Sequence, residues 1–255
     1  MSDKDRAGWP KRLWIVRHGE SAGNVARDLA RDRKQARIDI AMRDVDVPLS
    51  DQGRAQAAAL GDWFAALPAK ERPDVVLSSP YLRARDTVAA IGAAGGLAHN
   101  DVHVRIDERL REREFGILDR LTTRGIRELH PEQWQLRQSL GKFYHRPPGG
   151  ESWCDVILRL RSLLDTVSVH DGGKDVLVVC HQVVVLCFRY LIEELDEAEI
   201  LRIDREAEVA NCAITEYAFD PDLGRLRRVR YNFVAHMREA GAPVTREPDR
   251  SVAAR

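Results

Sequence analysis

Residues 13–21 read LWIVRHGES, so that four large apolar residues run directly into an arginine, a histidine and a glycine. The apolar residues predict a buried strand. Open α/β sheets bind ligands where their strands end, and we therefore expect Arg17 and His18 to face a cleft. Gly19 permits a sharp turn because it has no Cβ. Arginine presents a forked cation that suits phosphate, and histidine offers a nitrogen nucleophile near neutral pH. Taken alone, this stretch fits a surface hydrogen-bonding pair equally well.

The length and composition fit one globular α/β domain. The chain has 255 residues, of which 44% are apolar and 31% charged. Lys and Arg total 40 and Asp and Glu total 40, so no overall field would recruit nucleic acid or an acidic membrane. The basic run at 225–230 alternates along a predicted strand and is interpreted as a solvated hairpin face. Any anion site must therefore be a local concentration of charge.

The N-terminal residues, the apolar runs and the cysteine spacing bear on the cellular compartment of the protein. Residues 1–6 are polar with no apolar signal core after them, and the longest apolar run, Val183–Phe188, is too short to span a bilayer. The cysteines lack the CxxC spacing of a zinc site and lie in apolar surroundings, which predicts buried free thiols. They are Cys154, Cys180, Cys187 and Cys212. We therefore predict a cytoplasmic protein without a membrane partner.

Strands and helices alternate along the chain, which predicts a single domain over residues 1–255. Its core is expected at about residues 12–235, with flexible tails at 1–11 and 237–255. The fold class is a three-layer α/β/α sandwich with a mostly parallel sheet. The predicted strands are 75–77, 102–106, 176–180 and a hairpin of 212–219 with 226–233, and the clearest helices follow Ser50 and Glu151.

Two segments have little regular pattern. Residues 25–46 hold several arginines and one lysine, and Val25 and Leu29 suggest a short amphipathic helix near the start. This segment is either a solvated surface excursion or a basic flap over the site. In residues 117–150 a short helix is predicted from Thr123 to Leu129, followed by a polar, aromatic loop.

Three apolar strands each deliver cation-capable groups to the same predicted sheet edge. The first brings Arg17 and His18, the second Arg83 in the first turn of the following helix, and the last His181. A phosphoryl group needs its peripheral charge balanced during in-line attack, which the other cationic groups could do while His18 acts as a neutral nucleophile. Glu112 could protonate the leaving alkoxide and then activate water.

Five blocks of the chain, in order, resemble the signature of the histidine phosphatase superfamily. They lie at residues 13–24, 48–53, 78–84, 110–116 and 178–181. This resemblance implies a phosphoglycerate-mutase-like fold and a phosphoric monoester hydrolase that uses no metal and no cofactor. Residue by residue, the implied catalytic residues are His18 as the phosphorylated group, Glu112 as the proton donor, and Arg17, Arg83 and His181 around the phosphate. Glu114 competes with Glu112 for the acid role.

The resemblance also points to a branch and to the substrate side of the site. Residues 149–152 and 180–184 are similar to fructose-2,6-bisphosphatases and related bacterial phosphatases. The chain departs from that branch at Thr123, Trp153 and Leu186, where two tyrosines and an arginine are expected, and this puts a second phosphate pocket in doubt. The implied substrate-binding residues are Ser21, Asn24, Arg113 and Gln182.

Three functions follow from these observations. The favoured one is a metal-independent phosphatase that hydrolyses a small phosphorylated metabolite through a phosphohistidine at His18. The second is a cofactor-dependent phosphoglycerate mutase, and the third is a non-catalytic binding module on the same fold. The expected partner is the small phosphorylated substrate, and the sequence leaves a homodimer open.

Overall fold

The computed structural model describes residues 8–98, 102–206 and 208–246, and the six strands found there form one sheet in the order β3-β2-β4-β1-β5-β6. The strands are β1 Arg12–Arg17, β2 Val75–Ser78, β3 His103–Ile106, β4 Asp175–Cys180, β5 Ile214–Asp220 and β6 Arg225–Phe233. The helices are α1 Ala22–Asp32, α2 Asp51–Ala66, α3 Leu82–Ala93, α4 Thr123–Leu129, α5 Pro131–Tyr144, α6 Trp153–His170, α7 Gln182–Ile192, α8 Glu197–Glu206 and α9 Ala235–Glu239.

The sheet is mostly parallel, as predicted. β1 pairs in parallel with β4, and β2 pairs in parallel with both β3 and β4. The predicted hairpin β5–β6 adds two antiparallel strands, with β5 against β1. Because β1, β2 and β4 are neighbours that run the same way, the residues that follow them meet at one edge of the sheet.

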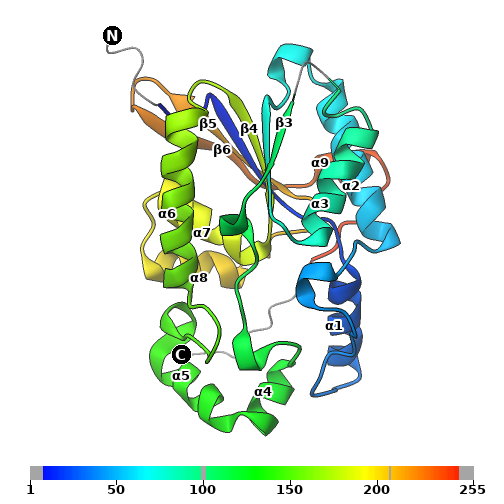
Figure 1. Cartoon of the computed structure of the whole chain (residues 1–255), viewed down its shortest axis with the longest axis vertical. Helices are drawn as coiled ribbons and strands as arrows, with labels where there is room; N and C mark the ends of the chain where they lie inside the picture. The colour runs from blue at the N-terminus through cyan, green and yellow to red at the C-terminus, as the bar shows by residue number, and fades with distance from the viewer. Residues whose placement is uncertain (1–7, 99–101, 207, 247–255) are drawn as a thin grey trace.

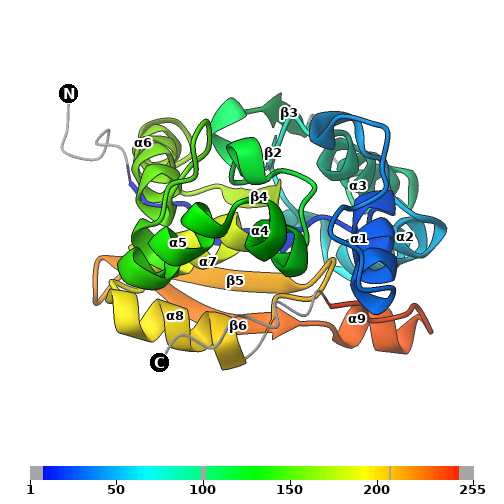
Figure 2. The same cartoon turned by 90° about the horizontal axis from the view of Figure 1, so that it is seen from below.

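Helices cover both faces of the sheet (Figures 1 and 2). α6, α7 and α8 lie on one side, and α2, α3 and α9 lie on the other. The helices begin where the sequence provides caps: Ser50 caps α2 through the amide of Gly53, and Ser152 forms a capping box with Asp155 at the start of α6. This arrangement is the predicted three-layer sandwich.

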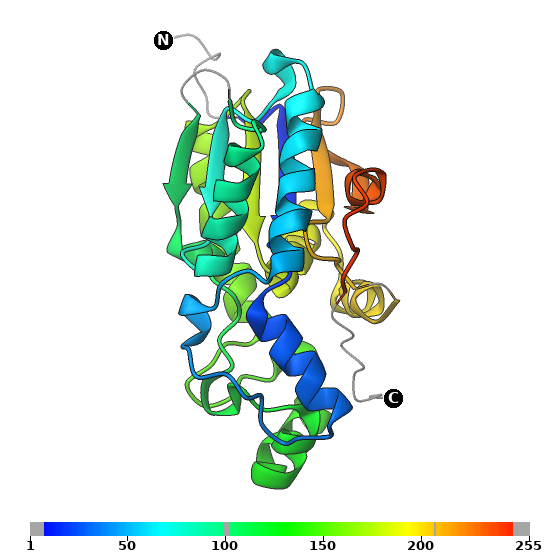
Figure 3. The ribbon, with the colours of Figure 1, turned by 90° about the vertical axis from the view of Figure 1, so that its right-hand side faces the viewer.

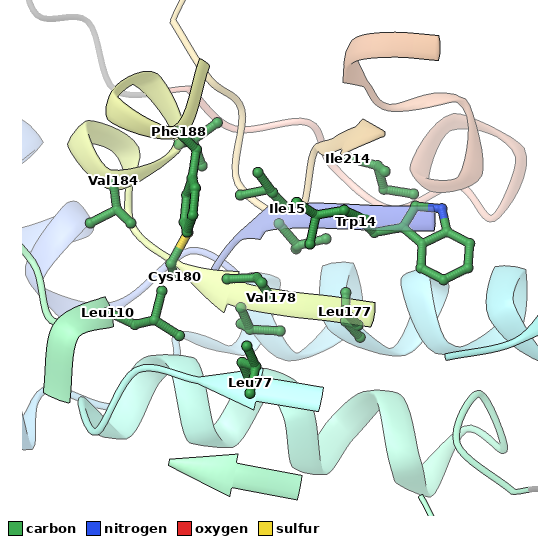
Figure 4. Close-up of a cluster of buried hydrophobic side chains, with 14 of the residues drawn as sticks. Trp14, Ile15, Leu77, Leu110, Leu177, Val178, Cys180, Val184, Phe188 and Ile214 are labelled. Carbon is green, nitrogen blue, oxygen red and sulfur yellow. The ribbon is translucent and has the colours of Figure 1, made fainter. Parts of the chain in front are cut away.

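The apolar residues of the opening stretch form the centre of the core (Figure 4). Trp14 and Ile15 on β1 are fully buried, and Trp14 contacts Phe64 of α2 edge to face with ring centroids 5.4 Å apart. Val178 of β4 and Phe188 of α7 belong to the same cluster. Burying one such side chain contributes about 1.5–3 kcal/mol, so this strand is held firmly in place. A firmly held β1 fixes the backbone position of His18.

A separate group of helices lies beyond the carboxyl ends of the parallel strands. Figures 1 and 3 show α1, α4 and α5 gathered there, away from the two helical faces of the sheet. The segment after α1 is joined to the segment before α4 by an antiparallel bridge between Arg37 and Leu121. We call residues 22–47 and 115–144 the cap. The prediction of a short helix at residues 123–129 is confirmed by α4.

Three predictions about irregular segments were wrong. Residues 8–11 were expected to belong to a flexible leader, but the carbonyl of Trp9 accepts from the amide of Gly173 at 3.1 Å and the amide of Lys11 donates to the carbonyl of Lys174 at 2.8 Å. The stretch after α4 was expected to be a loop, but Pro131–Tyr144 forms α5, which is kinked at Gly141. Residues 237–246 were expected to be a flexible tail, but Met237 is buried and the side chain of Gln56 donates to Thr245 Oγ1 at 2.7 Å. The predictions of flexibility for residues 1–7 and 247–255 lie outside the described residues. In the part of the chain that the structure describes, no helix is long and apolar enough to cross a membrane.

Candidate active site

Backbone hydrogen bonds hold His18 in place, and a contact of its ring fixes the tautomer of the imidazole. Its amide donates to the carbonyl of Cys180 at 2.9 Å, and its carbonyl accepts from Asn211 Nδ2 at 3.0 Å. The ring atom Nδ1 lies 2.7 Å from the carbonyl oxygen of Gly19. A carbonyl only accepts, so Nδ1 carries the proton and Nε2 keeps its lone pair. Arg83 Nε donates to Nε2 at 3.3 Å, which agrees with this assignment.

The surroundings of His18 keep the ring uncharged. Burial lowers its pKa well below the usual value, and the charges of Arg83 and Arg17 lower it further. A neutral imidazole with a free lone pair can attack phosphorus, whereas an imidazolium cannot. The same two arginines would attract the negative phosphoryl group that the nucleophile must meet.

His181 lies beside His18 as the sequence predicted. The two ring centroids are 5.0 Å apart, and His181 Nε2 is 2.8 Å from Ser79 Oγ. Burial lowers the pKa of His181 well below its usual value, followed by the effect of Arg83. The ring of Tyr81 packs against His181 at 5.1 Å and also lies under the guanidinium of Arg83 at 4.8 Å. The residues after β2 therefore position both a histidine and an arginine.

Arg83 is engaged by an acid that the sequence did not predict. Its Nη1 donates to the carbonyl oxygen of Asp44 at 2.6 Å and to Oδ1 at 3.0 Å, and Nη2 donates to Oδ2 at 3.1 Å. Asp44 begins a short 3₁₀ turn, Asp44–Asp46, in the cap. Its carboxylate therefore occupies the paired N–H groups that a phosphate would use.

We expect Asp44→Asn to strengthen inhibition by inorganic phosphate. The amide keeps the shape of the side chain but removes the charge that competes for Arg83 and repels an anion. The inhibition constant for phosphate should fall by about fivefold, as expected for losing one partly exposed ion pair. Steady-state inhibition assays at fixed ionic strength measure it.

Asp46→Asn is the matched control for this substitution. Asp46 lies in the same turn, but its carboxylate accepts from Arg43 Nε at 2.7 Å and not from Arg83. Its inhibition constant should equal that of the wild type. An unchanged constant in Asp44→Asn would show instead that phosphate does not displace Asp44.

Arg17 is buried next to the site rather than on its surface. It is 1% exposed, and its Nη1 donates to the carbonyl of Val209 at 2.7 Å. Burial lowers its pKa to about 10, an effect that the charge of Glu112 opposes. The cleft surface, within the described residues, includes His18, Arg83 and Glu112 but neither Arg17 nor His181. Arg17 therefore acts on the unliganded site through its charge.

The structure separates the two candidate acids. Glu112 Oε2 lies 4.0 Å from His181 Nδ1, and burial raises the pKa of this carboxyl. Glu114 instead accepts a hydrogen bond from the hydroxyl of Tyr81 at 2.8 Å. A raised pKa keeps a carboxylic acid protonated to a higher pH, which suits proton donation in a cleft that His18 also lines. The geometry therefore favours Glu112 over Glu114.

Close backbone contacts explain the predicted block at residues 48–53. The amide of Ser50 donates to the carbonyl of Glu20 at 2.9 Å, and a Cβ on Gly53 would overlap that same carbonyl. Only glycine lets the start of α2 approach the loop after His18 this closely. On the other side of the loop, the amide of Gly19 donates to Thr87 Oγ1 at 3.1 Å. The loop that carries the nucleophile is therefore clamped between α2 and α3.

The site opens into a cleft of about 290 Å³ between the sheet edge and the cap. α1 lines it with Asn24, Arg27 and Arg31, which recur at the spacing of one helical face. The basic segment at residues 25–46, which begins in α1, is thus part of the cleft wall, in agreement with the flap interpretation. Val25 and Leu29, on which the helix prediction rested, are 48% and 45% exposed. The helix is present, but its apolar pair faces away from the core.

The four predicted substrate-binding residues all line this cleft. Ser21 and Asn24 form the capping box of α1. Gln182 is the first residue of α7, and its buried Oε1 has no hydrogen-bond partner among the described residues, so it is available to a ligand. Arg113 is committed differently, because its Nε donates to the carbonyl of Glu151 at 2.7 Å and its guanidinium stacks on Phe115. Its contacts are those of a residue that holds the loop.

Three residues that support the site were not predicted from the sequence. They are Asp44, Ser79 and Asn211, which bond Arg83, His181 and the His18 carbonyl respectively. Ser79 directly precedes a proline in the block at residues 78–84, and this position is a signal that could have indicated a role. Asp44 and Asn211 lie in segments without any regular pattern.

Two further surfaces were considered in the sequence. On β6 the basic residues are paired with acids: Arg228 with Glu193 at 2.6 Å and Arg230 with Glu216 at 2.7 Å. These ion pairs agree with a structural hairpin face. The four cysteines are free thiols. Among the described residues, no cluster of His, Cys, Asp and Glu side chains has the form of a metal site.

Comparisons with known proteins agree with this geometry. The 2,3-bisphosphoglycerate-dependent phosphoglycerate mutase 2 of Gloeobacter violaceus is 30% identical over 212 residues, which cover 82% of this chain and 86% of that protein. A phosphoglycerate mutase-like protein of Arabidopsis thaliana is 31% identical over 182 residues, which cover 68% of this chain. The match spans only 57% of the length of the Arabidopsis protein.

Solved structures and a family profile extend the comparison. The structure of a mycobacterial glucosyl-3-phosphoglycerate phosphatase superposes with a TM-score of 0.65 and 26% identity, covering 87% of this chain and 99% of that one. The profile of the histidine phosphatase superfamily (branch 1) matches residues 13–232. The expected phosphoglycerate-mutase-like fold and the expected histidine phosphatase type are thereby confirmed at the level of the family. The chain belongs to the histidine phosphatase superfamily.

Proposed function

We propose that this protein is a metal-independent phosphatase that hydrolyses a small phosphorylated metabolite through a phosphohistidine at His18. The observation that carries the proposal is the tautomer of His18. Its Nδ1 proton is fixed on the Gly19 carbonyl, while the lone pair of Nε2 meets the guanidinium of Arg83 at 3.3 Å. This is the arrangement of a neutral nucleophile beside a phosphate-binding cation.

In the first half of the reaction His18 Nε2 attacks phosphorus. The Nε2–P bond forms while the bond between phosphorus and the ester oxygen breaks, and Glu112 gives its proton to the leaving alkoxide. The guanidinium of Arg83 then donates to the phosphoryl oxygens instead of to His18 Nε2. In the same movement its paired N–H groups leave the carboxylate of Asp44. The charge of Arg17, which lies close enough to lower the pKa of His18, supports the same oxygens.

In the second half Glu112, now a carboxylate, takes a proton from water. The hydroxide equivalent attacks phosphorus, the Nε2–P bond breaks, and inorganic phosphate leaves. His18 and Glu112 return to their starting states, so that every proton and electron pair is accounted for. The cationic side chains supply the positive charge that the transferring group needs, and for this reason we propose that no metal takes part.

The four free thiols, three of them buried, suit a reducing compartment, and this supports our proposal that the protein works in the cytoplasm. The cleft volume of about 290 Å³ fits a small phosphomonoester rather than a phosphorylated protein surface.

We expect the purified protein to release inorganic phosphate from a panel of small phosphomonoesters, with the same rate after dialysis against EDTA. Phosphate release measured with and without EDTA tests both parts of the proposal. A rate that collapses in EDTA and returns with a divalent cation would contradict metal independence. 3-Phosphoglycerate belongs in the panel because of the Gloeobacter relative: isomerisation to 2-phosphoglycerate without phosphate release would assign the protein as a mutase instead.

A further inference from the structure

The cap segment after α1 presents a strip of apolar side chains to the cleft. Ile38, Ile40 and Met42 all line it, and Met42 is at the same time 45% exposed. The residues at 37, 39, 41 and 43 are also exposed. The amide of Ile40 donates to the carbonyl of Ile38 at 3.1 Å, so the chain turns tightly at Asp39 while both isoleucines line the cleft. We call Ile38, Ile40 and Met42 the apolar strip.

A second group of apolar side chains lines the cleft, among charged residues such as Asp119, Arg120 and Arg137. It is formed by side chains from the loop before α4 and from α4 and α5, and these are Phe115, Leu118, Leu121, Ile126 and Trp134. Trp134 is covered on one ring face by the guanidinium of Arg127 at 4.7 Å. An alcohol bound in this part of the cleft would therefore meet apolar side chains from both segments.

The strip is fixed in position by backbone contacts rather than resting loosely over the site. The amide of Ile38 donates to the carbonyl of Arg120 at 2.9 Å, and the Arg120 guanidinium donates back to the carbonyls of Ile40 and Met42 at 3.1 and 2.8 Å. A Cβ on Gly125 would overlap the carbonyl of Ala36, so the two segments approach as closely as backbones can. The two groups of apolar side chains are thus fixed relative to each other.

The strip leads directly to the phosphate end of the cleft. Asp44 follows Met42 by two residues and holds the guanidinium of Arg83, whose Nε meets His18. Among the cations of the cleft, Arg27 lies near this end, because its charge contributes to lowering the pKa of His18. Lys142 is paired with Asp204 at 2.6 Å. An ester bound at His18 would therefore extend its alcohol along the apolar strip.

We propose that the substrate is a phosphomonoester whose alcohol carries an apolar or aromatic body, and this inference rests on the proposed function. An alkyl or aryl group gains free energy for each methylene that it buries against the strip. A polyhydroxylated alcohol of the same length must instead leave hydroxyl groups without partners against Ile38, Ile40 and Met42. The cleft thus discriminates by polarity beyond the shared phosphate.

A series of n-alkyl phosphates tests this inference. Propyl to hexyl phosphate share nearly the same leaving-group basicity, so that differences in kcat/KM report contacts of the chain. We expect kcat/KM to rise by about fourfold for each added methylene. Glycerol 1-phosphate, which is propyl phosphate with two hydroxyl groups, should react about tenfold less efficiently than propyl phosphate.

Ile40→Thr links the effect to the strip, and Ile117→Thr is its matched control. Ile117 is 46% exposed and is not among the residues that line the cleft. In Ile40→Thr the factor by which kcat/KM rises for each added methylene should fall towards one, that is, towards no gain. In the control this factor should equal that of the wild type. Thermal unfolding of both variants checks that each is folded.

The outcomes separate this inference from the function on which it rests. Hydrolysis of the whole series without a dependence on chain length, or with glycerol 1-phosphate as the better substrate, would overturn the apolar substrate and leave the phosphatase intact. A slope that survives Ile40→Thr unchanged would also overturn it. Failure to hydrolyse any ester would overturn the proposed function itself.

Discussion

His18→Ala is expected to lower kcat for phosphomonoester hydrolysis by more than about 10⁴-fold, because it removes the group that forms the bond with phosphorus in the proposed mechanism. Among the described residues His181 is the other histidine beside the site, but its Nε2 lies 2.8 Å from Ser79 Oγ and it is fully buried. It cannot take over without breaking that contact. Phosphate release under single-turnover and steady-state conditions measures the loss.

His103→Ala is the matched control, since His103 is exposed on the edge strand β3. Its turnover should equal that of the wild type. Circular dichroism and thermal unfolding should show that both variants are folded, because the backbone of residue 18 keeps its bonds to Cys180 and Asn211. A folded His18→Ala protein with wild-type turnover would refute the proposed nucleophile.

Glu112→Gln is expected to lower the first-turnover rate with alkyl phosphates by about 10²- to 10⁴-fold. Glutamine keeps the size of the side chain but has no proton to give to the leaving alkoxide. With p-nitrophenyl phosphate the leaving group needs no proton, so the rate of the nitrophenolate burst should stay within about tenfold of the wild-type rate. The steady-state release of nitrophenolate after the burst should be slower than in the wild type. Rapid-mixing assays with the two kinds of ester separate these effects.

The pH profile gives a second readout. Burial raises the pKa of Glu112, which keeps the acid protonated to a higher pH than an exposed glutamate. The first-turnover rate with alkyl phosphates should therefore fall as the pH rises through this raised pKa, and Glu112→Gln should lose that limb. Glu114→Gln is the control, because Glu114 bonds Tyr81 instead. A larger loss in Glu114→Gln than in Glu112→Gln would assign the acid role to Glu114.

The sheet and the convergence of the site could be predicted because both follow from local pattern. A continuous apolar run such as Val176–Cys180 is typical of a strand buried inside a parallel sheet. The carboxyl ends of such strands then lie at the same edge of the sheet. The polar residues that follow each strand must meet at that edge. The positions of His18, Arg83 and His181 at this edge are therefore predictable from the sequence.

The cap could not be predicted in the same way, because long-range contacts decide its structure. α5 carries Leu136 and Leu140 at 42% and 45% exposure, so its apolar residues do not form the inward stripe that identifies a helix. The role of Asp44 depends on a contact with Arg83 across 39 positions of the chain. Nothing in the segment around Asp44 indicates that contact.

The region after β6 is a second segment whose structure the sequence does not predict. Residues 237–246 are polar and without a pattern, which suggested a tail, but Thr245 accepts from Gln56 of α2 and donates to Asn211. Asn211 in turn donates to the carbonyl of His18. A polar segment can thus be ordered by hydrogen bonds to a site, and composition alone does not reveal this.

The most direct test of the account is to trap the phosphorylated enzyme. The protein is mixed with p-nitrophenyl phosphate, quenched within one turnover in alkali, where phosphohistidine is stable, and digested for tandem mass spectrometry. We expect the mass of one phosphoryl group on His18, its loss on brief treatment with acid, and stronger labelling in Glu112→Gln, whose phosphoenzyme hydrolyses slowly. Phosphate found on His181 or on another side chain, or a first turnover complete without any covalent label, would contradict the proposed mechanism.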